Sequence, residues 1–421
     1  MSPTQILPNG CVFPVSLLDT DLYKLTMQQA ILHHFPNVQS TYRFTNRDQK
    51  KGRYFTRKCY DLFKASLPYF ANLALTDVEH EWLRKTCPYL TAEYLDYLHK
   101  FRPHPEQVKV TFEPVSKDGQ LGNIEIEAVG LWVEAIYWEV PLMSTLSEIH
   151  FTTGDTDWSY VGQDAMAYKK GRILLEAGCT FSEFGTRRRR SFRTQDVVVQ
   201  ALIRAARDFP GKGALSGTSN VHLAMKYGVQ PIGTIAHEWF MGVATLKGYQ
   251  NCSGIALDLW EAVYPNALHF ALTDTFSTEV FYRDFVADPD RARRWKGLRQ
   301  DSGDPFIYAP RAKQIYESLG IDYRTKSLIF SDAIDLEKAL GLKKQCDELG
   351  FPCTFGIGTW LTNSFNKSSD ENEPSKALNM VIKLASVDGK PCVKISDEIM
   401  KNTGDPTTVK SVKDIFGLPH E

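Results

Sequence analysis

The sequence predicts an α/β protein, and three observations support this fold class. The chain has 421 residues, which at about 150 residues per domain suggests two or three structural units. Its 43% hydrophobic and 24% charged residues are ordinary values for a folded globular protein. Beyond residue 178, short apolar runs end in polar or glycine-rich clusters, and a helix-like segment follows each cluster. This alternation favours a barrel or a doubly wound sheet.

The first domain is expected over residues 1–145 and combines helices with a small sheet. Residues 60–105 carry apolar side chains at spacings of three and four, which predicts helices. Residues 106–140 alternate apolar and polar side chains, which predicts strands, and Asp118-Gly119 supplies a hairpin turn between them. Residues 361–421 begin with a polar loop and continue as an alternating segment that is expected to rejoin this domain.

The second domain is expected over residues 146–360 and holds about seven βα units. Its predicted strands end near Phe184, Leu215, Ile235, Leu272, Leu298, Phe330 and Phe355. Ser219-Asn220 is a predicted cap for a helix that ends before Gly228. Ser331-Asp332 is a predicted cap for a longer helix that ends at Gly350.

Charge and cysteine content exclude several classes of protein. Lysine and arginine total 49 and aspartate and glutamate total 50, so a net charge of −1 gives no overall attraction to nucleic acid or to an anionic membrane. The chain shows no basic segment leading into an apolar one and no run of about 18 apolar residues. Its eight cysteines include no Cys-x-x-Cys pair, which indicates reduced thiols. We therefore expect a cytoplasmic protein that binds neither nucleic acid nor membrane.

Ligand-binding residues are expected at the carboxyl ends of the strands, which meet at one edge of a parallel sheet. After the last predicted strand, Gly356 and Gly358 would let backbone N–H groups approach a phosphate, and Thr359 would add a hydroxyl. Taken alone, this cluster is more simply an ordinary turn, but its position favours phosphate. The sequence contains neither a Walker loop nor a G-x-G-x-x-G fingerprint.

Titratable side chains mark three further strand ends. His237 is a candidate general base or nucleophile, with a hydrogen-bonded structural histidine as the alternative. Zinc is disfavoured because Met241 stands where an H-E-x-x-H site needs histidine. Asp274, Asp301 and Asp304 are candidates to orient a histidine, bind magnesium or bind sugar hydroxyls, and capping of the following helices is the simpler alternative.

Five arginines lie within seven residues, a density that suits a phosphate, pyrophosphate or carboxylate ligand. They are Arg187, Arg188, Arg189, Arg190 and Arg193. A nuclear localisation signal or a nucleic-acid patch is the alternative, which leaves a nuclear fraction open. Because the run follows an apolar segment and enters an amphipathic helix, we expect some arginines to face the cavity and others solvent. Near the N-terminus, Asp19, Asp21 and Tyr23 are typical of a helix cap with a half-buried tyrosine.

Together, the motifs of this chain resemble the nicotinate phosphoribosyltransferase family, in the same order and at matching spacing. They are DTDLYKLTM, EFGTRRRRS, GTSN, IGTIAHEW, LTDTF, RQDSGDP and FGIGT, with VIKL, KISD and GDPTTVK near the end. The resemblance implies an irregular, incomplete α/β barrel beside a smaller α/β domain built from both chain ends. It also implies that nicotinate reacts with 5-phosphoribosyl 1-pyrophosphate to give nicotinate mononucleotide and pyrophosphate, with coupled ATP hydrolysis. This is the first step of NAD biosynthesis from nicotinate.

The resemblance further implies how nicotinate is bound. Tyr23 and Phe184 would sandwich the pyridine ring, and a nearby arginine would bind the carboxylate. Arg187, Thr218 and Ser219 are the other expected substrate-binding residues. Nicotinamide-using relatives carry an aspartate where this chain has Ser219. Because a serine places no carboxylate beside an acidic substrate, nicotinate is favoured, and a nicotinamide-using enzyme is the alternative.

The resemblance also implies roles in phosphate chemistry. ATP would transiently phosphorylate His237, with Asp274 holding its ring, and the Arg187 region, Arg299 and Asp301 would help to stabilise the leaving pyrophosphate. Magnesium is expected mainly on the pyrophosphate, with Asp301 as a candidate ligand. The ribose 5-phosphate would lie against Ser331, Gly356, Gly358 and Thr359.

Two other functions and two oligomeric states remain as alternatives. A quinolinate-type transferase would lack His237 and the arginine run, and a nucleic-acid-binding protein would bind through that run. A monomer or a homodimer is expected, since in dimeric relatives the tyrosine that matches Tyr23 completes the site of the partner subunit.

Overall fold

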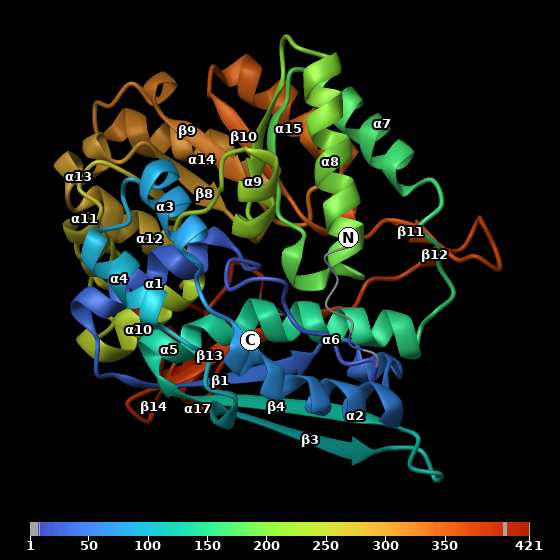
Figure 1. The fold of residues 1–421 in the computed structure, drawn as a ribbon. Helices are drawn as coiled ribbons and strands as arrows, with labels where there is room; N and C mark the ends of the chain where they lie inside the picture. The colour runs from blue at the N-terminus through green and yellow to red at the C-terminus, as the bar shows by residue number, and fades with distance from the viewer. Residues whose placement is uncertain (1–6, 8, 399–401, 421) are drawn as a thin grey trace.

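Two six-stranded sheets organise the computed structural model, which describes residues 7, 9–398 and 402–420 (Figure 1). The first sheet is antiparallel, with the order β14-β13-β1-β4-β2 and β3 paired to β4. Its strands are β1 (Gln39–Asn46), β2 (Phe55–Thr56), β3 (Val108–Pro114), β4 (Leu121–Leu131), β13 (Met380–Val387) and β14 (Lys390–Pro391). The second sheet is parallel, with the order β6-β5-β10-β9-β8-β7. Its strands are β5 (Thr180–Glu183), β6 (Ala214–Thr218), β7 (Phe270–Leu272), β8 (Gly297–Gln300), β9 (Ser327–Phe330) and β10 (Cys353–Ile357).

Helices separate successive strands of the parallel sheet and also cover the antiparallel sheet (Figure 1). Those in the first part of the chain are α1 (Leu22–His34), α2 (Arg57–Ser66), α3 (Asp77–Thr86), α4 (Ala92–Lys100), α5 (Trp132–Ala135), α6 (Glu139–Thr153) and α7 (Gln163–Glu176). Next come α8 (Phe192–Asp208), α9 (Val221–Tyr227), α10 (His237–Lys247), α11 (Cys252–Val263), α12 (Thr278–Val286) and α13 (Pro289–Arg294). The last are α14 (Pro305–Ser318), α15 (Leu336–Leu349), α16 (Thr359–Thr362) and α17 (Pro406–Phe416), while β11 (Phe365–Asn366) and β12 (Pro374–Ser375) form a short ribbon.

The antiparallel sheet joins the two ends of the chain. Strand β1 pairs with β13, so that Ser40 lies opposite Val387 and Asn46 opposite Met380. Figure 1 shows the blue β1 beside the red β13, although more than 300 residues separate them in the sequence. The α/β class and the smaller domain built from both chain ends are therefore confirmed.

Helix α6 lies between the two sheets (Figure 1). It contacts β13 on one side and the segment Thr186–Arg188 on the other, and residues 139–151 are all buried. A helix that is buried all round must satisfy its polar side chains internally. Glu148 accepts a hydrogen bond from the backbone N–H of Phe192, 2.9 Å away, which ties α6 to the start of α8.

One predicted strand is too long and another is wrong. The alternating pattern forms β4 but ends at Leu131, and Trp132 begins a helix because the next turns bury consecutive side chains, which a strand with one exposed face cannot do. The strand expected to end near Ile235 is absent from the described residues. Its segment makes a single bridge, Thr218 with Pro231, so the parallel sheet has six strands rather than seven, and no ladder among the described residues joins β7 to β6.

Helix caps follow the sequence signals closely. Asn220 caps α9 by accepting from the N–H of Leu223, and Gly350 ends α15 in the left-handed conformation, as predicted. The cap of α15 is Asp335, however, and not the predicted Ser331-Asp332. The hydroxyl of Ser331 instead donates to Asp301, 2.5 Å away, which leaves it in the candidate site.

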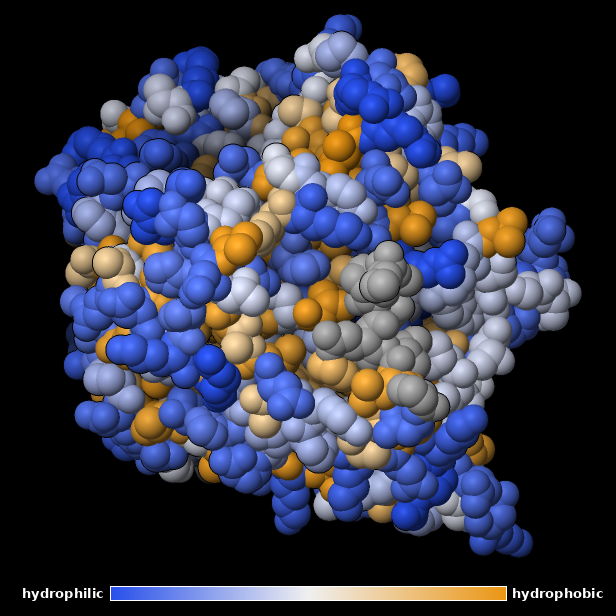
Figure 2. All heavy atoms as spheres, viewed as in Figure 1, coloured by the Kyte–Doolittle hydropathy of each residue, from blue (hydrophilic) through white to orange (hydrophobic). Residues whose placement is uncertain are grey.

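The interior is apolar and the surface mixed. Buried aromatic rings such as Trp132 and Trp239, whose centroids lie 6.3 Å apart, fill the core, and all eight cysteines are free. On the face shown in Figure 2, hydrophobic residues form separated groups among hydrophilic ones. None of the helices in the described residues is both long and apolar enough to cross a lipid bilayer.

Candidate active site

A cavity of about 640 Å³ opens at the carboxyl ends of β5, β8, β9 and β10. The candidate site residues that line it are Phe184, Arg187, His237, Arg299, Asp301, Ser331, Gly356, Gly358 and Thr359. The candidates that lie outside its lining are Tyr23, Thr218, Ser219 and Asp274. The opposite wall comes from the antiparallel sheet, so the cavity is bounded by both domains.

Two glycines create the space for Phe184. A Cβ on Gly356 would come within 2.3 Å of the Phe184 ring, and a Cβ on Gly358 would come within 2.8 Å of the Phe184 carbonyl oxygen. The aromatic ring can lie across β10 only because these positions carry no side chain. The sequence predicts the glycines for phosphate approach, whereas the structure shows that they also position an aromatic wall.

Three side chains surround the ring of His237, the first residue of α10. Nδ1 lies 3.1 Å from the Thr275 hydroxyl, and Nε2 lies 3.0 Å from Lys394 Nζ and 3.2 Å from Asp301 Oδ2. Because an ammonium group can only donate, Nε2 accepts from Lys394 in this arrangement and Nδ1 carries the proton. Burial and the Lys394 charge lower the pKa of His237, which favours the neutral imidazole.

Asp274 makes hydrogen bonds to residues around His237 rather than to its imidazole ring. Its Oδ2 lies 3.8 Å from His237 Nε2, beyond hydrogen-bond distance. The same oxygen accepts from Ser302, 2.5 Å away, and from Lys394, 3.3 Å away. Asp274 caps no helix, since Ser277 caps α12. Asp301 is therefore the carboxylate nearest the ring, a position that the sequence analysis gives to Asp274.

Arg299, Asp301 and Ser331 form one hydrogen-bonded group across two strand ends. Arg299 donates to the Ser331 hydroxyl over 2.9 Å and to Asp301 over 3.3 Å. Although burial opposes it, the charges of Arg299 and Lys394 hold the pKa of Asp301 well below its usual value. Asp301 is thus ionised beside the histidine, whereas Asp304 of the same motif caps α14.

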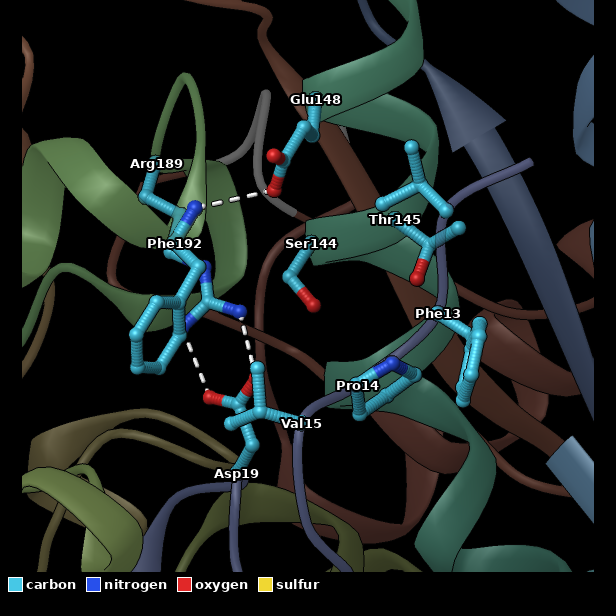
Figure 3. Close-up of a pocket in the computed structure, with 10 residues that line it drawn as sticks. Phe13, Pro14, Val15, Asp19, Ser144, Thr145, Glu148, Arg189 and Phe192 are labelled. Atoms are coloured by element: carbon cyan, nitrogen blue, oxygen red, sulfur yellow. Dashed lines mark hydrogen bonds and ion pairs between the residues drawn. The ribbon is translucent and has the colours of Figure 1, made fainter. Parts of the chain in front are cut away.

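The arginine run divides between the cavity and the protein interior. Arg187 and Arg188 line the cavity. Arg189 donates to both carboxylate oxygens of Asp19 over 2.7 Å, and Figure 3 shows its guanidinium pointing at Asp19. Arg190 is fully buried. Two of the four consecutive arginines therefore fix the loop that presents the other two.

The GTSN turn is closed by the segment that precedes Tyr23. The Ser219 hydroxyl donates to Asp21, 2.7 Å away, and Thr218 donates to Glu183, 2.6 Å away. A carboxyl group does lie beside Ser219, which corrects the argument that this site avoids one. Burial raises the pKa of Asp21, while Arg187 opposes that shift. Tyr23 is half-buried, with its ring centroid 6.0 Å from the Arg187 guanidinium.

Several cationic cavity residues are absent from the sequence-based site. They are Arg47, Lys383 and Lys394, which follow β1, lie in β13 and follow β14. Only the pairing of β1 with β13 places them opposite the parallel strands. One sequence signal points to Lys383: it lies two residues from Val381 on an alternating strand, so both face the same side and both line the cavity.

No group of three or more metal-ligating side chains occurs within the described ranges. The carboxylates on the cavity wall are Asp301, Asp332 and Asp335. Magnesium commonly takes one or two protein carboxylates together with substrate phosphates. The donor set therefore fits a magnesium ion carried mainly by a phosphate substrate, with Asp301 as the carboxylate nearest His237.

Comparison with known proteins covers nearly the whole chain. The nicotinate phosphoribosyltransferase family model matches residues 179–420, and the model of the family's N-terminal domain matches residues 18–147. The nicotinate phosphoribosyltransferase of Methanosarcina mazei is 40% identical over 420 residues, which cover 96% of this chain and 98% of that protein. That of Saccharomyces cerevisiae is 41% identical over 411 residues, covering 96% and 95%.

Solved structures agree with this match. A crystal structure from Saccharomyces cerevisiae has a TM-score of 0.92 at 40% identity and covers 96% of this chain and 98% of that one. The crystal structure of the nicotinate phosphoribosyltransferase from Porphyromonas gingivalis has a TM-score of 0.86 at 35% identity, with coverage of 96% and 99%.

Proposed function

Because the chain belongs to the nicotinate phosphoribosyltransferase family, we propose that it joins nicotinate to 5-phosphoribosyl 1-pyrophosphate and couples this step to ATP hydrolysis. The full reaction consumes nicotinate, 5-phosphoribosyl 1-pyrophosphate, ATP and water. It yields nicotinate mononucleotide, pyrophosphate, ADP and phosphate. One observation carries the proposal: a single cavity holds an aromatic wall, a neutral histidine and six basic side chains. These basic residues are Arg47, Arg187, Arg188, Arg299, Lys383 and Lys394.

Nicotinate is assigned to the end of the cavity at Phe184 and Arg187. The Phe184 ring offers a flat apolar surface to the pyridine ring. About 43% of the Arg187 side chain is exposed, so its guanidinium can bind the substrate carboxylate. The Tyr23 ring, whose centroid lies 6.0 Å from the Arg187 guanidinium, would cover the other face of the pyridine. Holding the ring this way directs its nitrogen toward C1 of the ribose.

The ribosyl phosphate and the leaving pyrophosphate are assigned to the strand ends. Gly358 precedes α16, Thr359 begins it, and Ser331 follows β9, so backbone N–H groups and hydroxyls meet there. As the bond from C1 to pyrophosphate breaks, negative charge grows on the leaving oxygen. Arg299 and Lys394 would stabilise that charge.

ATP chemistry is assigned to His237. The γ-phosphoryl group would pass to Nε2, breaking the bond to ADP, and water would later cleave the phosphohistidine to release phosphate. The neutral ring and the Nδ1 hydrogen bond to Thr275 support this role. Magnesium bound to the phosphates would neutralise part of their charge, and Asp301 would hold it.

The proposal is tested by measuring product formation with magnesium and 5-phosphoribosyl 1-pyrophosphate. Nicotinate or nicotinamide is offered, each with and without ATP. We expect nicotinate to yield nicotinate mononucleotide, and to do so faster when ATP is present. Product from nicotinamide alone would identify the alternative substrate, and no product from either would reject the transferase.

A His237→Ala variant separates transfer from ATP coupling. It should keep part of the transferase activity and lose the stimulation by ATP, because the phosphoryl acceptor is gone while the sugar-phosphate groups remain. ATP hydrolysis at the wild-type rate in this variant would show that His237 is not the acceptor.

A further inference from the structure

Four charges of alternating sign connect the nicotinate end of the cavity with the residue next to His237. Arg187 Nη1 lies 3.2 Å from Glu139 Oε1. Lys24 Nζ lies 2.5 Å from Glu139 Oε2 and 2.5 Å from Glu238 Oε1. We call Arg187, Glu139, Lys24 and Glu238 the charge chain. Its members come from four separate segments, and Glu238 is the second residue of α10.

Protein encloses the three inner members of the charge chain. Only 1% of the Lys24 side chain and 9% of each carboxylate side chain is exposed. The Tyr23 hydroxyl donates to Glu139 over 3.3 Å, and the Tyr42 hydroxyl donates to Glu238. With so little water nearby, charge interactions are weakly screened, so a change at one member is felt by the next.

Glu139 and Lys24 are each shared between two partners of opposite charge. Glu139 divides its charge between Arg187 and Lys24, and Lys24 divides its charge between Glu139 and Glu238. Although burial opposes it, Lys24 and Arg187 hold the pKa of Glu139 below its usual value. Arg187 alone among the four lines the cavity. An anion that binds Arg187 therefore competes directly with Glu139.

We propose that the charge chain makes ATP turnover at His237 responsive to the carboxylate of nicotinate, an inference that rests on the proposed function. When the carboxylate pairs with Arg187, Glu139 turns more fully to Lys24, and Lys24 loosens its bond to Glu238. The first turn of α10, which carries His237, is then free to adjust. Glu139, Lys24 and Glu238 are positioning residues in this scheme. Nicotinamide has no carboxylate and leaves the charge chain unchanged.

The test measures phosphate release from ATP with and without nicotinate, in the wild type and in K24M, E238Q and K24M/E238Q. Nicotinate should stimulate the wild type, and the stimulation should fall at least about fivefold in each single variant, the lower range of coupling between two sites. The double variant removes one charge of each sign. It should recover thermal stability lost in K24M, while the stimulation stays lost because the charge chain is still cut.

A buried lysine elsewhere supplies the matched control. Lys326 is 5% exposed and donates to the carbonyls of Arg293 and Trp295 over 2.7 and 2.8 Å. It precedes β9, at the end of the strand opposite the cavity. K326M should lose stability like K24M and keep the full stimulation by nicotinate.

The outcomes separate this inference from the proposed function. Full stimulation in the double variant would make the charge chain purely structural and would overturn the inference. If K24M does not fold, E238Q decides, because it keeps the side-chain shape and a hydrogen-bond acceptor. A wild type that forms nicotinate mononucleotide without hydrolysing ATP would overturn both the coupling and the inference, whereas coupled turnover with unaltered variants would overturn the inference alone.

Discussion

Arg187 and Arg188 lie in surroundings unlike those of Arg189 and Arg190, although the four are consecutive. The first two line the cavity, whereas Arg189 is 3% exposed and Arg190 is fully buried. Arg189 pairs with Asp19, while Arg190 makes hydrogen bonds to neutral partners and stacks on aromatic rings. A cluster of like charges in a sequence therefore need not bind one ligand. Here half of the cluster builds the support on which the other half is presented.

Among these arginines, replacing Arg187 should cause the largest loss of activity. In Arg187→Ala, kcat/KM for nicotinate should fall about 1000-fold, since truncating one partner of a hydrogen-bonded charge pair costs about 4 kcal/mol. The free energy of unfolding should change little, because Glu139 keeps Lys24 as a partner. Steady-state kinetics with nicotinate varied, beside urea unfolding, measures both. An unchanged kcat/KM would remove Arg187 from the nicotinate site.

Replacing Arg190 should lower the stability of the protein, whereas replacing Arg187 should lower its activity. Arg190 donates to Asn363 Oδ1 over 2.8 Å and to the Ser375 carbonyl over 2.7 Å, and both groups are buried. In Arg190→Met they lose their donor, so the free energy of unfolding should fall by about 3–4 kcal/mol. Urea unfolding checks this value. Loss of activity in a variant of normal stability would instead place Arg190 in the catalytic site.

The surroundings of the buried Arg189 can be tested through Glu148, because the pKa of this carboxyl makes the free energy of unfolding depend on pH. Burial raises the pKa of Glu148 from 4.5 to about 7, although Arg189 opposes the shift. The folded chain therefore binds this proton more tightly than the unfolded chain, so the stabilisation is complete below pH 4.5 and is lost as the pH rises to about 7. Glu148→Gln should remove that loss and stabilise the protein at pH 8 by at most about 3 kcal/mol.

The comparison for Glu148 is made by urea unfolding of variant and wild type at pH 5 and pH 8. Glu176→Gln, which alters an exposed carboxylate, should show the same small difference at both values. An equal difference at both values for Glu148→Gln would mean that its carboxyl is ionised in the folded protein throughout this range.

Replacing Arg193 should give the smallest effect of the group. Its side chain is exposed and lies 4.4 Å from the centroid of the Tyr160 ring. An exposed cation–π contact contributes about 0.5 kcal/mol, so Arg193→Ala should change the free energy of unfolding by no more than that. Its kcat/KM should stay within about twofold of wild type. A larger loss of activity would extend the site beyond the first two arginines.

Local patterns in the sequence predict the helices and strand ends that depend on residues close together in the chain. Polar clusters mark the ends of β5, β8, β9 and β10. Asn220 begins α9 and Gly350 ends α15 as expected, because capping depends on neighbours in the chain. The segment before Ile235 shows the limit of such patterns. An apolar run there makes one bridge instead of a strand, since pairing depends on what lies beside it.

The amino-acid sequence by itself determined the α/β class, the strand ends that carry the site and nine residues that line the cavity. Tertiary structure alone decided which arginines line the cavity, which carboxylate lies nearest His237, and that Lys394 lies 3.0 Å from His237 Nε2 although 157 positions separate the two residues. The physical reason is one of range. Periodicity, capping and turn chemistry act over a few residues, whereas the pairing of β1 with β13 and the burial of ion pairs depend on which distant segments pack together.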